Sequence, residues 1–174
     1  MLMLNNFSGF GVAPAGGTVQ TLVDRTIGTR IGNMTGAGGL AAAFDGTTAQ
    51  SSGNCAVIIS GDRTIGYCGK DWGASVTKII SGFIAYGPSD YGIDQLYTGS
   101  STIDLEGSTD NFSSSIVSLG TISFTDGAAV VVTKLTGLTA TTAYRYHRVK
   151  ITSSSPTTST DNKSLAELQF YEEL

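Results

Sequence analysis

The residues that could carry acid–base or nucleophilic chemistry are few in this chain. His147 is its one histidine, and neither a Gly-x-Ser-x-Gly sequence nor a cysteine-nucleophile signature accompanies it. The surrounding run, from Tyr144 to Ile151, has the aromatic and β-branched character of a strand. We therefore expect His147 to be a strand residue with polar neighbours and not the base of a catalytic triad.

Six carboxylates could in principle supply the acid and base of a glycoside hydrolase. Such a pair must lie about 5 to 9.5 Å apart across a cleft. Nearly all six occur in turn sequences, where aspartate ordinarily caps the backbone. They are Asp71, Asp90, Asp94, Asp104, Glu106 and Asp110. We predict that the protein is not an enzyme and has no catalytic residue, with a small hydrolase as the weakest alternative.

Tyrosines gather around the loop Gly87-Pro88-Ser89-Asp90 and form a candidate ligand site. Sugar recognition uses an aromatic face for C–H groups and planar polar side chains for pairs of hydroxyls. The residues of this kind are Tyr86, Asp90, Tyr91 and Tyr97. They predict a carbohydrate-binding rim, while the alternative is that these tyrosines only pack. Trp72, in an Asp-Trp-Gly sequence, is expected in the core.

The scaffold that must position these residues is predicted to be all-β. Of 174 residues, 40% are hydrophobic and 14% are charged, which suits one domain with a buried core. Runs rich in β-branched residues alternate with turn clusters and show no sustained helical face. They cover residues 18–23, 56–60, 76–86, 115–124, 128–135, 144–151 and 165–171. This spacing predicts an antiparallel sandwich or barrel.

Two local features refine that scaffold. In the last strand Ala166, Leu168 and Phe170 alternate with polar residues, so they are expected to face the core. Residues 40–44 are expected to form either one helical turn or an irregular loop, on the surface near an end of the sandwich. Cys55 and Cys68 are too few for a disulfide framework, and either a single bond or two reduced, buried thiols would fit them.

The first 17 residues are predicted to be an arm outside a domain that spans 18–174. The arm has no strand or helix periodicity, and its apolar side chains lie among glycines. We expect it to dock on another subunit, in a homo-oligomer or on a larger particle. The docking residues would be Leu4, Phe7, Phe10 and Val12.

Charge and hydropathy argue against two classes of partner. Ten basic and 14 acidic residues leave a net charge of -4, so we expect neither nucleic acid nor anionic lipid as a partner. No run approaches the roughly 20 apolar residues that span a bilayer. Asn5 and Asn6 interrupt the initial Met-Leu-Met-Leu, and no basic segment precedes it, so a secretory signal is not expected.

From about Gly39 onward, the order of motifs resembles the discoidin (coagulation-factor type C) and carbohydrate-binding-module group of galactose-binding-like jelly rolls. Six pieces carry the resemblance, although Asn111 stands where the family pattern has glycine. They are Ala42-Ala43-Phe44-Asp45-Gly46-Thr47-Thr48, Ile65-Gly66-Tyr67-Cys68-Gly69-Lys70-Asp71-Trp72-Gly73, Val76-Thr77-Lys78-Ile79 together with Tyr86-Gly87-Pro88-Ser89-Asp90, Leu105-Glu106-Gly107-Ser108-Thr109-Asp110-Asn111-Phe112, Tyr144-Arg145-Tyr146-His147-Arg148-Val149-Lys150-Ile151 and Ala166-Glu167-Leu168-Gln169-Phe170. The resemblance implies an antiparallel jelly-roll β-sandwich, a scaffold that hosts many different ligands.

The resemblance also implies a structural calcium ion. In similar modules an Asp-Gly loop and a glutamate on the last strand share the ion, and the matching positions here are Asp45, Thr48 and Glu167. Calcium takes six to eight oxygen ligands, so loop carbonyls would complete its shell. The alternative is that Asp45 only caps its turn and Glu167 faces water.

The apolar arm, the low charge and the compact β-domain together have the character of a bacteriophage-type virion accessory protein. We therefore expect a non-enzymatic head-decoration or tail-associated adhesion module, made in the host cytoplasm and located in the virion. The arm would attach to other virion subunits, and the jelly roll would face outward with a cell-surface glycan as its candidate ligand. The alternative is a free carbohydrate-binding module.

Overall fold

The computed structural model describes residues 19–58, 63–94, 100–125, 132–153 and 162–173. The predicted arm with its docking residues Leu4, Phe7, Phe10 and Val12 lies outside these ranges, as does Tyr97.

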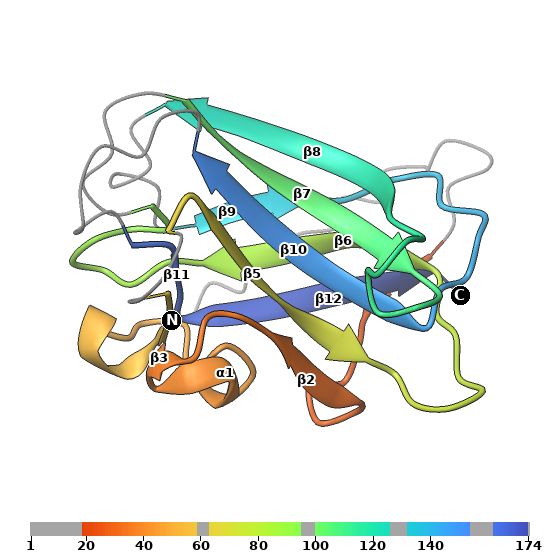
Figure 1. Cartoon of the computed structure of the whole chain (residues 1–174), viewed down its shortest axis with the longest axis horizontal. Coiled ribbons are helices and arrows are strands. Elements are labelled where there is room, and N and C mark those ends of the chain that lie inside the picture. The colour runs from red at the N-terminus through yellow and green to blue at the C-terminus, as the bar shows by residue number, and fades with distance from the viewer. Residues whose placement is uncertain (1–18, 59–62, 95–99, 126–131, 154–161, 174) are drawn as a thin grey trace, which may run out of the picture.

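Two antiparallel sheets form the body of the domain (Figure 1). One has the strand order β1-β12-β6-β9, and its strands are β1 (Gln20–Leu22), β12 (Glu167–Glu173), β6 (Ile80–Tyr86) and β9 (Val132–Leu135). The other has the order β2-β5-β10-β7-β8, and its strands are β2 (Thr29–Gly32), β5 (Ile65–Asp71), β10 (Tyr146–Ser153), β7 (Ser100–Ser108) and β8 (Val117–Thr125). The predicted all-β jelly-roll sandwich is confirmed.

Smaller elements gather at one end of the sandwich, at the left of Figure 1. A short third sheet has the order β11-β4-β3, with strands β11 (Ser164–Leu165), β4 (Ala56–Val57) and β3 (Gly36–Ala37). Beside it lie the helix α1 (Gly39–Ala42) and the 3₁₀ turn η1 (Ser52–Asn54). None of the helices in the described ranges is long and apolar enough to cross a membrane.

Strand alternation explains the core between the two large sheets. In β10, His147, Val149 and Ile151 are buried, while the residues between them are only partly covered. Leu168 and Phe170 of β12 pack from the opposite sheet, as the sequence pattern predicts. Each large apolar side chain buried in this way contributes about 1.5 to 3 kcal/mol.

The segment 40–44 is partly helical, and it lies near an end of the sandwich as expected. Its burial differs from the expectation, because Ala42, Ala43 and Phe44 are buried, whereas Leu40 is half-buried and only Ala41 is exposed within this segment. The ring of Phe44 packs against that of Phe170, with centroids 6.5 Å apart. This contact anchors the loop that follows α1 to the core.

The two cysteines are free and buried. Burial raises the pKa of the Cys55 thiol to about 11 and that of Cys68 to about 12. Trp72 is also in the core, as predicted, with 4% of its surface exposed.

Candidate functional site

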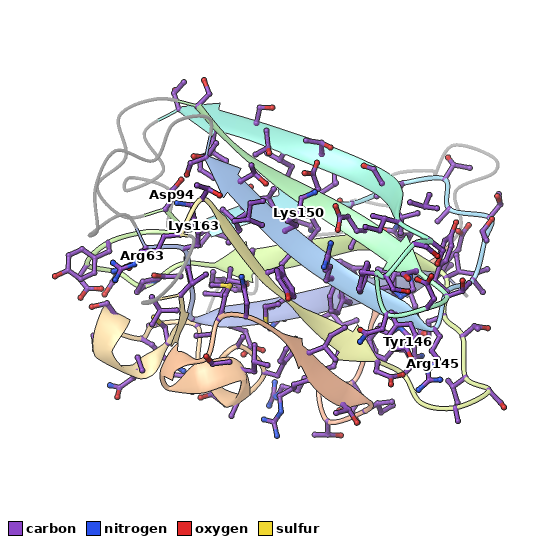
Figure 2. The ribbon with its side chains drawn as sticks, viewed as in Figure 1. Arg63, Asp94, Arg145, Tyr146, Lys150 and Lys163 are labelled. Atoms are coloured by element: carbon purple, nitrogen blue, oxygen red, sulfur yellow. The ribbon has the colours of Figure 1, made fainter. Side chains whose placement is uncertain are left out.

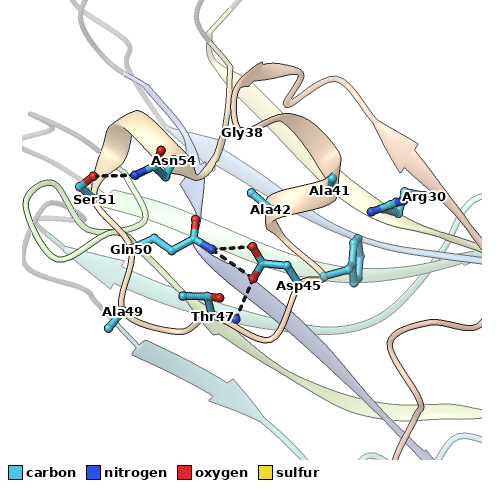
Figure 3. Close-up of a pocket in the computed structure, with 11 residues that line it drawn as sticks. Arg30, Gly38, Ala41, Ala42, Asp45, Thr47, Ala49, Gln50, Ser51 and Asn54 are labelled. Carbon is cyan, nitrogen blue, oxygen red and sulfur yellow. Dashed lines mark hydrogen bonds between the residues drawn. The ribbon is translucent and has the colours of Figure 1, made fainter.

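A polar pocket of about 640 Å³ lies beside α1 (Figure 3). We call it the α1 pocket. Its polar lining comes from three separate segments, namely β2, the loop after α1, and η1 with its flanks. The lining side chains with polar groups include Arg30, Asp45, Thr47, Gln50, Ser51 and Asn54. Most of these groups are planar amides, a carboxylate and a guanidinium, which suit the hydrogen bonding of a hydroxyl-rich ligand.

Asp45 organises the loop on one side of the α1 pocket. Its Oδ1 accepts a hydrogen bond of 2.7 Å from the backbone N–H of Thr47, which closes the turn around Gly46. The amide Nε2 of Gln50 donates to both carboxylate oxygens of Asp45, at 3.1 and 2.9 Å. The amide of Gln50 is thereby fixed in one orientation (Figure 3).

Gln50 is the most unusual residue of this pocket. Its residue surface is only 8% exposed, and its Oε1 atom is buried without a hydrogen-bond partner among the residues that the structure describes. A buried acceptor left unpaired costs about 1 to 3 kcal/mol. Because the donor side of the amide is held by Asp45, Oε1 is an acceptor that the described residues leave unsatisfied.

The predicted ligand loop around Asp90 lies directly behind this pocket. The carboxylate of Asp90 accepts from the backbone N–H of Ser52 at 3.0 Å and from its hydroxyl at 2.8 Å. The N–H of Ser89 donates to the carbonyl of Gln50 at 3.1 Å. The loop therefore supports the η1 wall of the α1 pocket, and the Asp90 carboxylate is already occupied.

The tyrosines predicted beside Asp90 lie in two different environments. Tyr86 is half-buried and packs against Cys55, Val57 and Ala166. Tyr91 has 37% of its surface exposed, which leaves its ring accessible at the end of the sandwich. The role of these side chains in ligand binding stays a prediction.

Arg30 is a site residue that the sequence did not indicate. Its side chain is exposed on β2, and the guanidinium makes no hydrogen bond or ion pair with the described residues. Figure 3 shows it at the opposite side of the α1 pocket from Ser51 and Asn54. Its strand is only four residues long, Thr29–Gly32, and is flanked by Gly28, so no propensity pattern marks it.

The predicted calcium ligands Asp45 and Glu167 approach each other around Gly46. Glu167 is fully buried, and its Oε2 accepts a 2.9 Å hydrogen bond from the Gly46 N–H. Burial raises the pKa of the Glu167 carboxyl, whereas the Gly46 hydrogen bond and the charge of Arg25 act in the opposite direction. The expected alternative, in which Glu167 faces water, does not hold, because the loop after α1 covers this side chain.

The fit of a cation depends on one atom. Oε1 of Glu167 is buried and makes no hydrogen bond within 3.5 Å to any described residue, although the Gln169 side chain acts on this carboxyl and lowers its pKa. A cation could therefore satisfy this oxygen. In the described ranges, no group of three or more His, Cys, Asp or Glu side chains could hold a metal ion. An ion would therefore need carbonyl and hydroxyl oxygens for most of its shell, with exposed Thr48 as one source. Calcium at this position stays a prediction.

The six carboxylates considered for catalysis all have protein partners. Asp94 forms a buried ion pair with Lys163 at 2.8 Å, and Figure 2 shows the two side chains near the η1 end. Asp71 pairs with Arg145. The others bond Ser52 (Asp90), Thr121 (Asp104), Arg148 and Lys150 (Glu106), and the serines of the turn 108–115 (Asp110). Four of them, Asp71, Asp94, Asp104 and Glu106, pair with basic side chains. Asp71 also accepts from the backbone N–H of Gly73, so it caps its turn as expected.

Comparison with known proteins places the fold. No family model and no curated protein matches the sequence. Among solved structures, the chain is similar to the CBM62 module of Clostridium thermocellum Xyl5A, with 25% identity over 84% of this chain and 94% of that one, at a TM-score of 0.58. It is also similar to the family 32 CBM of C. perfringens NanJ, solved in complex with galactose, with 13% identity, coverage of 88% and 100%, and a TM-score of 0.61.

A third similar structure is the F5/8 type C domain of a Bacteroides fragilis protein. The identity is 14%, the coverage is 88% of this chain and 97% of that one, and the TM-score is 0.57. These likenesses agree with the six motifs found in the sequence. The chain has the galactose-binding-like jelly-roll fold of carbohydrate-binding modules and discoidin domains.

Proposed function

We propose that this protein is a non-catalytic glycan-binding domain whose primary site is the α1 pocket. The observation that carries the proposal is Oε1 of Gln50, a fixed, buried acceptor that no described residue satisfies, in a pocket lined by polar side chains. A sugar hydroxyl is both donor and acceptor, so it can donate to Oε1 while accepting from a neighbouring guanidinium or amide. Arg30 and Asn54 offer such donors.

The structural neighbours support the same class of ligand. One was solved with galactose, and another, the lectin domain of lectinolysin, with Lewis B antigen. A third is a fucose-binding module from Streptococcus pneumoniae. All of these ligands are carbohydrates, so we take carbohydrate as the ligand class here and leave the individual sugar to experiment.

A glycan array tests the proposal, followed by titration of the Gln50→Ala variant. We expect binding to at least one glycan and a loss of tenfold or more in affinity on substitution, because the fixed acceptor disappears. Gln20→Ala is the matched control, since Gln20 is a partly buried glutamine on β1 that bonds Ser81 and Gly137. Wild-type protein that binds no glycan would refute the function, and a Gln50→Ala variant with full affinity would refute the site.

The virion role is a second proposal, supported by the apolar sequence of residues 1–17. In this arrangement the arm attaches the domain to a particle, and the domain binds glycans on a cell surface. The alternative is a glycan-binding module that works without a particle. Deletion of residues 1–15 distinguishes these two arrangements.

A further inference from the structure

A second pocket, of about 430 Å³, lies on the outer face of the five-stranded sheet. We call it the sheet pocket. Arg148 of β10 and Tyr67 of β5 line its floor, and Phe112 lines it from the turn between β7 and β8. None of these three side chains takes part in the hydrogen bonds described above for the α1 pocket. Tyr67 and Phe112 give the sheet pocket aromatic rings. The α1 pocket offers no exposed ring among its described lining residues, because Phe44 is only 6% exposed.

The turn that carries Phe112 is held in an unusual conformation. Asn111 and Phe112 are consecutive non-glycine residues with φ of 58° and 62°, in the left-handed region. Bulky residues there cost of order 1 to 3 kcal/mol each and persist only where the surroundings impose them. Hydrogen bonds impose this turn, since the Phe112 N–H donates to Ser108 Oγ at 2.9 Å and Asp110 accepts from Ser114 and Ser115.

The effect of the turn is to place an aromatic ring over a fixed guanidinium. The Cζ atom of Arg148 lies 4.0 Å from the ring centroid of Phe112 and 4.7 Å from that of Tyr67. Nε of Arg148 donates to Glu106 at 2.6 Å, and Lys150 bonds the same carboxylate. Because Glu106 is only 3% exposed, these contacts fix the group as one rigid surface.

The sheet pocket adjoins the α1 pocket. Arg30 lines both, and within α1 Leu40 lines the sheet pocket while Ala41 and Ala42 line the α1 pocket. The two therefore meet across β2 and the start of α1. A ligand longer than one sugar could leave the α1 pocket past Arg30 and reach Phe112.

We propose, resting on the glycan-binding function above, that the two pockets form one track for an oligosaccharide chain. One sugar is held in the α1 pocket by hydrogen bonds. A further sugar of the same chain lies on the surface made by Phe112, Tyr67 and Arg148, where its C–H groups contact the parts of the rings that Arg148 leaves uncovered. The ligand class is thus a chain of several sugars, and a single terminal sugar occupies only part of the track.

The test is calorimetric titration with galacto-, xylo- and chito-oligosaccharides of one to four units. For the series that binds, we expect affinity to rise at least tenfold between one unit and four. Phe112→Ala should remove this gain and leave the affinity for the single sugar unchanged. Phe112→Tyr keeps a ring and should keep the gain, which separates loss of the ring from disturbance of the turn.

Tyr171→Ala is the matched control, because Tyr171 also carries a cation over its ring, with Lys134 Nζ at 5.2 Å, but belongs to the other sheet. It should change neither affinity. Affinity that does not depend on chain length would overturn the track, as would a Phe112→Ala variant with an unchanged gain or an equal loss for single sugars and chains. If single sugars bind in a Gln50-dependent way in those cases, the proposed function stands and only the track fails. Absence of binding by the wild type in every series and on the array would refute both.

Discussion

The indole N–H of Trp72 donates a 2.8 Å hydrogen bond to Nδ1 of His147, between residues that are 75 positions apart in the chain. Both side chains are buried, and the bond joins the end of β5 to the neighbouring strand β10. An Nδ1 atom that accepts a hydrogen bond carries no proton, so the imidazole is neutral with its proton on Nε2. His147 thus serves the core, as expected for a strand histidine with polar neighbours.

This relationship makes stability depend on pH. Burial, helped by the charge of Lys78, lowers the pKa of His147 from 6.5 to about 3. Between these two values the unfolded chain binds a proton that the folded chain does not, so the free energy of unfolding falls as pH falls. Urea denaturation at pH 7.5 and 5.5 should show a decrease of about 1.4 kcal/mol from this group.

His147→Gln supplies the control, because its amide oxygen can still accept from Trp72 while the group no longer titrates. The difference between wild type and variant isolates His147, since it is the one histidine of the chain. The raised pKa of Glu167 acts with the opposite sign and is common to both proteins. Equal pH dependence in the two proteins would show that His147 is protonated as easily in the fold as outside it.

Calcium is tested by thermal unfolding. If Asp45 and Glu167 hold the ion, Asp45→Asn or Glu167→Gln should lower the melting temperature in calcium buffer and abolish stabilisation by calcium. The scale is about 2.7 kcal/mol when calcium is about 100-fold above its dissociation constant. Asp24→Asn is the control, because exposed Asp24 only caps the turn to Thr26. Identical melting temperatures of the wild type in calcium and in chelator would remove the site.

The ion pair between Lys163 and Asp94 should be essential to folding. Both side chains are fully buried, and Asp94 also accepts from the hydroxyls of Ser101 and Ser153. Lys163→Met leaves a buried carboxylate without its counter-ion, which should cost about 3 to 5 kcal/mol. The double variant with Asp94→Asn should recover part of that loss in denaturant titration. Lys134→Met, at an exposed position, should change stability little, and a similar small effect at Lys163 would contradict the prediction.

Deletion of residues 1–15 tests the docking arm. The described strands begin at Gln20, so the sandwich should fold without the deleted residues. If Leu4, Phe7, Phe10 and Val12 dock on another subunit, light scattering and electron microscopy should show that assembly or particle attachment is lost. A truncated protein that assembles normally would favour the free glycan-binding module.

The sequence predicted those parts of the fold in which propensity and burial agree. In β12, Leu168 and Phe170 are buried as their alternation predicts, whereas Glu167 is buried as well and breaks the pattern. The run 144–151 was expected to be a strand, and β10 covers most of it. β5 and β7 were indicated by the family resemblance and not by the β-rich runs, because glycines interrupt one and acidic residues the other. An acidic residue such as Glu106 is expected on the surface from the sequence alone. In the fold it is buried, and its carboxylate forms ion pairs with Arg148 and Lys150.

The candidate site was less accessible to prediction, because it depends on contacts between distant segments. Gln50 has no motif, and its importance arises from the hydrogen bonds with Asp45 and from the covering loop. Asp90 was predicted to bind ligand from its place beside tyrosines, whereas its carboxylate bonds Ser52. Asn111, where the family pattern has glycine, adopts the left-handed conformation that asparagine tolerates better than most residues.

The pairing of β1 with β12 places the first and the last described strand side by side, with Gln20 next to the end of β12. Gln20 lies opposite Glu173 in the register, so the chain comes into the sandwich and leaves it at one end. α1 and η1 lie toward the other end (Figure 1). A tether or fused protein joined directly before β1 or after β12 would thus lie at the end of the sandwich opposite α1 and the α1 pocket. A fluorescent protein joined directly before Gln20 or after Glu173 should therefore leave the α1 pocket unobstructed.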